Sequence, residues 1–223
     1  MRNINQEKLN KILKEHELWV KGKGGKRANL RCANLENADL EYVNLKYADL
    51  KYANLSNTDL SNTDLRYTNL RCVDLRYTDL SYSNLSNADL SNANLSNANL
   101  SSANLKDIKT NIHTIGYNLA CPEEGSFIGY KKASGCLIEL LILEDAKRSS
   151  ATTAKCRCNK AKVLDIRDIK TGKKVKEIRS NYDSNFIYKV GEIIHVDNFD
   201  NNRWNECSTG IHFFVNKENA INY

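Results

Sequence analysis

Residues 46–65 read KYADLKYANLSNTDLSNTDL, with a leucine at every fifth position. The spacing runs without a break from Leu30 to Leu105, which makes sixteen leucines. A strand would bury and expose successive leucines in turn, and an α-helix would spread them around its circumference. The period of five instead predicts that each unit forms one side of a coil, with a turn between sides. Such units bury a core only by stacking on their neighbours, so the sequence predicts a solenoid.

The residues around each leucine follow the pattern A-(N/D)-L-x-x, as in Ala48-Asp49-Leu50. This run resembles the pentapeptide-repeat proteins, and the resemblance covers residues 28–107. It implies a right-handed, four-sided (quadrilateral) β-helix in which the leucine and the small residue two positions before it point inward. The small positions hold only Ala, Thr, Val or Ser, which suits a narrow interior. Four units to a coil and a coil spacing of ~4.8 Å predict about four coils and a rod on the order of 20 Å long.

Residues 1–27 are predicted to form a helical cap and linker at the start of the rod. Asn5 is a favourable N-cap for a helix that runs to about Val20. Trp19 is expected at the seam between this helix and the first coil. The glycine-rich turn at 21–26 lacks the spacing of a phosphate-binding loop, and no cofactor is expected. The apolar stripe expected to pack on the first coil comprises Leu9, Ile12, Leu13, His16 and Val20.

The five-residue repeat does not continue into residues 108–223, whose sequence predicts a β-rich α+β domain. The fold class predicted for the chain is therefore mainly β. A hairpin turn is expected at 170–172, and Asn216 is expected to cap a short closing helix. The domain is also expected to cover the second end of the rod, which disfavours an end-to-end dimer. Strands are expected at 127–130, 137–143, 161–169, 173–178, 193–196 and 211–215.

The C-terminal sequence resembles an uncharacterised domain that follows pentapeptide repeats in some bacterial and phage proteins. The matching elements include Phe-Ile-Gly-Tyr-Lys-Lys at 127–132 and Cys-Ser-Thr-Gly-Ile-His-Phe-Phe at 207–214. The Cys-Ser-x-Gly-Ile-His element is also similar to C-terminal segments of some phage proteins. The resemblance implies a phage or prophage context and carries no catalytic residue across.

Charge is unevenly distributed along the chain, whose net charge is +6. Residues 1–27 have eight basic and three acidic side chains (+5), residues 28–107 have seven and ten (−3), and residues 108–223 have eighteen and fourteen (+4). No apolar run is long enough to span a membrane, and none follows the initial Met, which predicts a cytoplasmic protein. Seven irregularly spaced cysteines then indicate reduced thiols rather than a disulfide framework.

Outward residues twenty apart become neighbours if four units make one coil. This places Arg31, Lys51 and Arg71 in one column and Lys46 and Arg66 in the next. Tyrosines accompany both columns: Tyr52 lies beside the first, and Tyr47 and Tyr67 lie beside the second. The pattern predicts either a solvated face or a basic, tyrosine-bearing binding strip for an anionic partner. Across the rod, Asp39, Asp59 and Asp79 form a separate acidic column, extended by Glu41.

Imitation of DNA, which some pentapeptide-repeat proteins use to modulate topoisomerases, fits this sequence poorly. Duplex DNA carries one charge per ~1.7 Å, so ~20 Å of it presents about a dozen negative charges. The repeats carry a net charge of only −3 and include a basic strip. Binding to duplex DNA is not expected either, because the chain is no strong polycation.

Two chemical alternatives concern the C-terminal domain. A hydrolase- or transferase-type activity would use Cys207 as a nucleophile with His212 or His195 as the base, with His195 on a neighbouring strand. A metal site would combine Cys156, Cys158, Cys207 and His212, although one residue between two cysteine ligands is unusual for zinc. A strand at 156–158 would place both sulfurs on one face. The catalytic alternative lacks an oxyanion-stabilising glycine run, and the spacing of Cys207 and His212 does not guarantee an orienting third group.

A non-enzymatic binding or scaffold protein is the function class that requires the fewest special residues in the sequence. Its partner is expected to be a protein or an anionic small molecule such as a nucleotide, and a crevice between rod and domain would be a suitable ligand site.

Overall fold

The computed structural model describes the whole chain, Met1–Tyr223, which forms two compact units. Unit 1 spans Met1–Asn118 and unit 2 spans Leu119–Tyr223. Strand and bridge structure predominates, and the two helices are α1 (Gln6–Val20) and α2 (Lys217–Asn222). Neither helix is long and apolar enough to cross a membrane.

Each repeat of unit 1 turns a corner directly after its leucine. At the first corner the N–H of Ala33 donates to the carbonyl of Leu30 at 3.1 Å, and Cys32 has a φ of 53°. A positive φ at the third of four residues is the conformation of a type II turn. It recurs at the second residue after every leucine, from Cys32 to Asp107. The sequence therefore repeats every five residues because this turn recurs every five residues.

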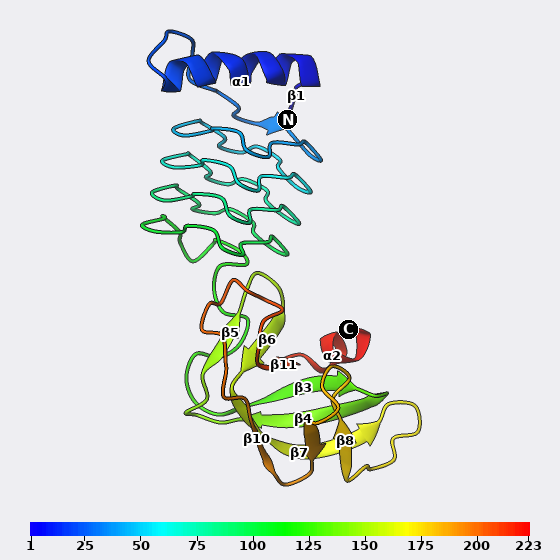
Figure 1. Ribbon diagram of the computed structural model, residues 1–223. Helices are drawn as coiled ribbons and strands as arrows, with labels where there is room; N and C mark the ends of the chain where they lie inside the picture. Colours follow the sequence, from blue (N-terminus) through cyan, green and yellow to red (C-terminus); the bar gives the residue numbers. More distant parts are fainter. The chain divides into compact units, whose positions relative to one another are not determined.

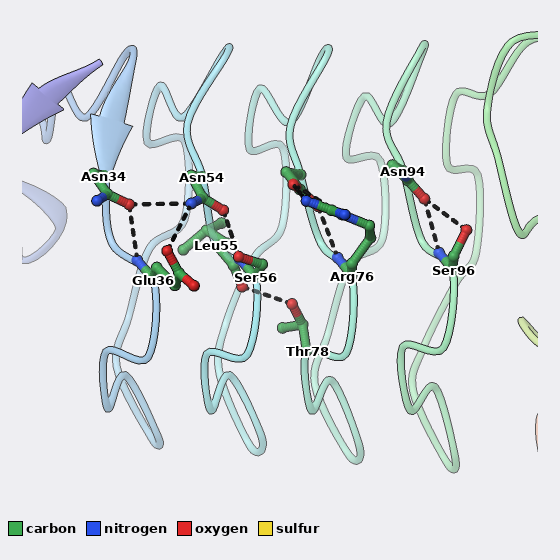
Figure 2. A network of polar contacts seen from close by, with 10 residues as sticks. Asn34, Glu36, Asn54, Leu55, Ser56, Arg76, Thr78, Asn94 and Ser96 are labelled. Atoms are coloured by element: carbon green, nitrogen blue, oxygen red, sulfur yellow. Dashed lines mark hydrogen bonds and ion pairs between the residues drawn. The ribbon is translucent and has the colours of Figure 1, made fainter.

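Stacking between circuits joins residues twenty apart. Parallel bridges link Asn29 to Asp49 and Asp49 to Asn69, so one circuit takes four repeats. The leucines from Leu30 to Leu100 are at most 3% exposed, whereas Leu105, at the end of the run, is half-buried. Buried threonine hydroxyls donate to leucine carbonyls of the preceding circuit, as Thr78 does to Leu55 at 2.7 Å (Figure 2). The interior thus leaves few polar atoms without a partner.

The Asn or Asp before each leucine stabilises the corner. In all sixteen repeats its side-chain oxygen accepts the backbone N–H of the residue two positions on, at 2.8–3.4 Å. Figure 2 shows this bond from Ser56 to Asn54 and from Ser96 to Asn94. This is an Asx turn, for which the amide and the carboxylate supply an equivalent acceptor.

The N-terminal segment belongs to the same unit. Strand β1 (Arg2–Asn3) pairs in parallel with β2 (Ala33–Asn34), and α1 lies across the first circuit (Figure 1). The Asn5 side chain accepts the N–H of Lys8 at 3.0 Å, which confirms the predicted N-cap. Leu9 and His16 on α1 are buried, and the N–H of Ala28 donates to His16 Nδ1 at 3.1 Å.

Unit 2 contains a seven-stranded sheet with the order β10-β7-β4-β3-β11-β6-β5, all neighbours being antiparallel. A second sheet pairs β8 (Glu177–Arg179) with β9 (Ile187–Lys189). The strands of the large sheet are β3 (Phe127–Ala133), β4 (Cys136–Ile142), β5 (Arg148–Ser150), β6 (Lys155–Cys158), β7 (Lys160–Asp168), β10 (Ile193–His195) and β11 (Ile211–Phe214).

Most of the strands predicted from sequence exist, and the predicted hairpin is shorter than expected. The turn at 170–172 forms, with the N–H of Gly172 donating to Asp168, yet β8 pairs with β9 rather than with β7. The expected hairpin is confined to its base, where the N–H of Asp168 donates to Lys173, the N–H of Val175 donates to Ile166, and Arg167 bridges Lys174. The closing helix α2 begins as predicted, because Asn216 accepts the N–H groups of Glu218 and Asn219.

Candidate binding surface

The predicted basic columns form on unit 1 because the bridges bring their repeats into register. Asn29, Asp49 and Asn69 stack, so Arg31, Lys51 and Arg71, two positions later, follow one another along the rod. The bridge from Asn44 to Asp64 does the same for Lys46 and Arg66. Aspartates within the repeats pair with the arginines: Arg31 with Asp49 at 3.3 Å, Arg66 with Asp64 at 2.6 Å and Arg71 with Asp89 at 3.7 Å.

These ion pairs cancel much of the positive charge that the sequence suggested. Burial raises the pKa of Asp64, but hydrogen bonds and charge from Arg66 outweigh it and hold that pKa below its usual range. The arginine pairs are largely solvated, so each contributes little to stability. Their main effect is that the arginines present a neutralised rather than a cationic surface.

The two lysines are different, because neither has a carboxylate within ion-pair distance. Lys46 Nζ lies 5.0 Å from the ring centre of Tyr47, and Lys51 Nζ lies 4.7 Å from that of Tyr52. Both are cation–π contacts with solvent-exposed tyrosines. Lys46 and Lys51 are therefore the uncompensated charges of the strip.

An aromatic ladder runs from α1 onto the rod beside these lysines. The Trp19 ring meets Tyr47 edge-on at 6.2 Å, and Tyr47 stacks on Tyr67 at 5.0 Å. The buried His16 ring stacks behind Trp19 at 5.7 Å. Trp19, Tyr47 and Tyr67 are 37%, 40% and 49% exposed, so the ladder is supported from behind and open in front.

The tyrosines occupy an unusual backbone position. Tyr47, Tyr52 and Tyr67 have φ values of 66°, 61° and 57°, in the left-handed region that favours Gly and Asn. Asn does occupy the equivalent corner at Asn57, Asn62 and Asn87. A tyrosine therefore costs more than asparagine at these corners.

His16 is a packed histidine and not part of the exposed surface. Burial lowers the pKa of His16, the backbone of Lys46 partly offsets this, and the charge of Arg27 adds to the lowering. The ring is thus neutral at pH 7, and Nδ1 is the acceptor. Its ring contributes to the surface only by stacking on Trp19.

The acidic column forms where it was predicted. Asp39, Asp59 and Asp79 bridge in series, and each carboxylate accepts the N–H two residues on. Asn62 Nδ2 lies 3.3 Å from Glu41, which extends the column. The main role of these carboxylates is to accept hydrogen bonds at the corners, and their negative charge is secondary.

No hydrogen bond joins Cys207 to His212 or to His195. Cys207 Sγ lies 3.4 Å from Lys155 Nζ, whereas His212 Nε2 lies 3.2 Å from the carbonyl of Glu206. Burial and nearby cations lower the pKa of His212 to about 4. The expectation that His195 lies on a neighbouring strand was wrong: β10 is at one edge of the sheet, and β7, β4 and β3 separate it from β11. His195 instead pairs with Asp197 at 2.8 Å.

The candidate metal ligands also point in different directions. Cys156 and Cys158 share one buried face of β6, opposite Phe213 and Ile211. His212 pairs with Arg157 and therefore lies on the other face. Nowhere in the chain do three His, Cys, Asp or Glu side chains gather closely enough to hold a metal ion.

Sequence reasoning missed part of the surface. It located Tyr47 and Tyr67 in one column and Trp19 at the seam, but did not join them into a ladder. The period of twenty between the tyrosines was the available signal. It also did not assign the aspartates before the leucines to particular arginines, whereas Asp49, Asp64 and Asp89 each form an ion pair with one arginine.

Comparison with known proteins agrees with this architecture. Pentapeptide repeats (8 copies) match residues 28–67 and again 68–107, and a family of unknown function (DUF5758) matches residues 117–220. Residues 28–107 therefore match the pentapeptide repeats, and most of the C-terminal part matches a family of unknown function. No curated protein matched it.

Solved pentapeptide-repeat structures resemble part of the chain. Rfr23 of the cyanobacterium Cyanothece 51142 is 43% identical over 40% of this chain and 60% of its own length, with a TM-score of 0.39. The protein alr5209 of Nostoc is 36% identical over 45% and 80%, with a TM-score of 0.41. HetL of Nostoc, described as involved in the regulation of heterocyst differentiation, is 36% identical over 38% and 39%, with a TM-score of 0.37. The chain thus spans less than two thirds of Rfr23 and of HetL.

Proposed function

We propose that the chain is a non-enzymatic binding protein, and that it binds through a cation–aromatic strip on unit 1. The strip comprises Trp19, Arg31, Lys46, Tyr47, Lys51, Tyr52, Arg66, Tyr67 and Arg71. The observation that carries the proposal is the half-exposed ladder of Trp19, Tyr47 and Tyr67. Pentapeptide-repeat proteins are generally non-enzymatic, which agrees with it.

The physical case rests on a rigid and amphipathic surface. Trp, Tyr and Arg are the residues most enriched among those that dominate binding energy at protein interfaces. Here the rings are held by stacking, and the tyrosine backbones belong to hydrogen-bonded corners. Little side-chain freedom is left to lose on binding, so more of the contact energy contributes to affinity.

The charge of the strip favours an acidic partner. Lys46 and Lys51 are not neutralised, and they flank the ladder at adjacent corners. An acidic patch on a protein that also offers apolar contacts would satisfy both the lysines and the rings. An anionic small molecule such as a nucleotide is the second candidate, because Lys51 beside Tyr52 offers both a charge and a stacking face.

The proposal includes the architecture that presents the strip: a right-handed, four-sided β-helix of about four coils with α1 as its N-terminal cap. The twenty-residue spacing of the bridges supports the four-sided coil, and burial of Leu9 and His16 supports the cap. A cytoplasmic location and a phage or prophage origin complete it. Both rest on sequence alone.

The test is a side-by-side capture experiment with matched variants. Lys46→Ser/Lys51→Ser removes the free charges, and Tyr47→Asn/Tyr67→Asn removes two rungs of the ladder. Asn is native at equivalent corners, so the second change preserves the backbone. Proteins captured from host lysate are compared by mass spectrometry, and small molecules released from the purified protein are analysed in parallel.

Two controls separate the strip from general surface effects. Lys106→Ser removes a lysine from the same position of a later repeat in the Lys46 column, and Tyr42→Asn/Tyr82→Asn removes exposed tyrosines from a different column. A partner or nucleotide retained by both controls and lost by both strip variants supports the proposal. Retention by the strip variants rejects it.

A further inference from the structure

Two cysteines of unit 2 that are far apart in sequence meet beneath a surface loop. Ala120 N–H donates to Ser150 Oγ at 2.8 Å, and Ser150 is the cross-strand partner of Cys156. The next residue, Cys121, is thereby brought beside Cys156, and the thiols are hydrogen-bonded to each other. Both belong to the buried core of unit 2, with exposures of 5% for Cys121 and 0% for Cys156.

The surroundings of Cys121 are positively charged. The guanidinium of Arg148 pairs with no carboxylate and is held by backbone carbonyls instead. Its acceptors include Gly125 at 2.8 Å, Glu144 at 2.8 Å, Leu143 at 2.9 Å and Pro122 at 3.2 Å. Arg203 is also anchored nearby, with Nε donating to the carbonyl of Ser150 at 3.0 Å. Fixed cations of this kind favour the thiolate form of a nearby cysteine.

The two thiols are therefore unequal. The hydrogen bond from Cys156, together with the charges of Arg148 and Arg203, outweighs burial and lowers the pKa of Cys121. The same hydrogen bond and burial raise the pKa of Cys156. Cys158, on the same face of β6, is directed elsewhere, with Sγ 3.8 Å from the carbonyl of Ile211. Cys121 thus has the character of an attacking thiol, and Cys156 that of a protonated partner.

We propose that Cys121 and Cys156 form a redox-active dithiol that exchanges with small disulfides of the glutathione type. The Cys121 sulfur attacks one sulfur of the small disulfide, whose S–S bond breaks and releases one thiolate. Cys156 then loses its proton to solvent, and its sulfur attacks Cys121 and releases the second thiol. The protein dithiol is oxidised to a disulfide, and the small disulfide is reduced to two thiols.

Access to the site depends on the loop that covers it. Ala120 and residues 122–124 are exposed on either side of the buried Cys121. Local opening of such a loop is the ordinary route by which a small reagent reaches a covered thiol. Once formed, the disulfide ties the first segment of unit 2, which begins at Leu119, to the fully buried strand β6.

The experiment treats the full chain with oxidised glutathione and maps the disulfides by mass spectrometry. Cys32→Ser/Cys207→Ser serves as the background, because these are the two exposed cysteines. The expected result is the loss of a pair of titratable thiols and a crosslinked peptide that joins Cys121 to Cys156. Retention of both thiols overturns the proposal, and so does a crosslink from Cys121 to Cys158.

Single variants test the assigned roles. Cys156→Ser is expected to accumulate a stable glutathione adduct on Cys121, whereas Cys121→Ser is expected to leave Cys156 unmodified. Cys136→Ser, a change in the same buried cluster on β4, is the control and is expected to form the crosslink normally. An adduct on Cys156 but not on Cys121 contradicts the assigned order. Mapping of the unsubstituted protein covers the case in which a variant fails to fold.

Discussion

The two units satisfy the hydrogen bonds of their buried polar groups in opposite ways. In unit 1 each corner uses a local rule: one Asn or Asp oxygen accepts one N–H two residues away. In unit 2, Arg157 is 1% exposed and holds a long loop through the carbonyls of Asp200, Asn202 and Thr209. The stability of the rod therefore depends on many small contacts between residues close in sequence. The stability of unit 2 depends on a few contacts between residues distant in sequence.

The chain provides its own reporters for this comparison. It has two tryptophans, Trp19 in unit 1 and Trp204 in unit 2. Trp204→Phe and Trp19→Phe proteins would let fluorescence follow the unfolding of each unit separately.

The largest expected effect is on the cores. Leu60→Ala in the rod and Leu140→Ala on β4 each empty a fully buried site and are expected to lower the free energy of unfolding by about 2–5 kcal/mol. Leu60→Ala should shift the Trp19 transition and Leu140→Ala the Trp204 transition in urea titrations. If either change moved both transitions equally, the two units would unfold as one, and the comparison would fail.

Arg157 gives the next largest effect. Arg157→Met removes the donors to three loop carbonyls, and each buried acceptor left unsatisfied costs roughly 1–3 kcal/mol before the loop relaxes. The Trp204 signal should lose cooperativity while the Trp19 transition keeps its midpoint. Arg203→Met, a change in the same loop, is the matched control and is expected to have the smaller effect, because Arg203 is less buried.

Acid should weaken unit 2 through His212. Burial and neighbouring cations depress the pKa of this group in the folded state to about 4, below its unfolded value of about 6.5. The unfolded state therefore binds more protons between these values, and stability is lost as pH falls from about 6.5 towards 4. His212→Gln should flatten this dependence in the Trp204 transition. An unchanged slope would assign the acid sensitivity to other groups.

The smallest expected effect has the opposite sign. Tyr42 is 72% exposed and has a φ of 59°, so Tyr42→Asn should relieve left-handed strain and stabilise unit 1 by up to about 1 kcal/mol. Tyr67→Asn makes the same change but loses the stack on Tyr47, so its gain should be smaller or absent. Equal stabilisation by both changes would mean that the ladder contributes nothing to the fold.

The rod was predictable because its rules are local. The spacing of Leu30 to Leu105 and the small residue two positions before each leucine follow from a single repeated turn, so sequence alone indicated the register of Arg31, Lys51 and Arg71. Asn5 and the stripe from Leu9 to Val20 likewise predicted α1, because capping and helical periodicity act over a few residues.

The fold of unit 2 could not be predicted in the same way, because its decisive contacts join residues that are distant in sequence. The pairing of β8 with β9, and of β11 with both β3 and β6, depends on which strands meet after collapse. Nothing near Arg157 indicates that it binds carbonyls forty or more residues away. The meeting of Cys121 and Cys156 was invisible for the same reason. For the candidate site, sequence identified the side chains but not the ion pairs that neutralise its arginines.

The equivalence of asparagine and aspartate at the corners has a consequence for how such rods diversify. Since either side chain closes the turn, the sign and placement of surface charge can be rewritten one repeat at a time without disturbing the interior. The backbone of the rod can stay the same while its surface residues are exchanged, so a new ligand preference requires no change in the backbone.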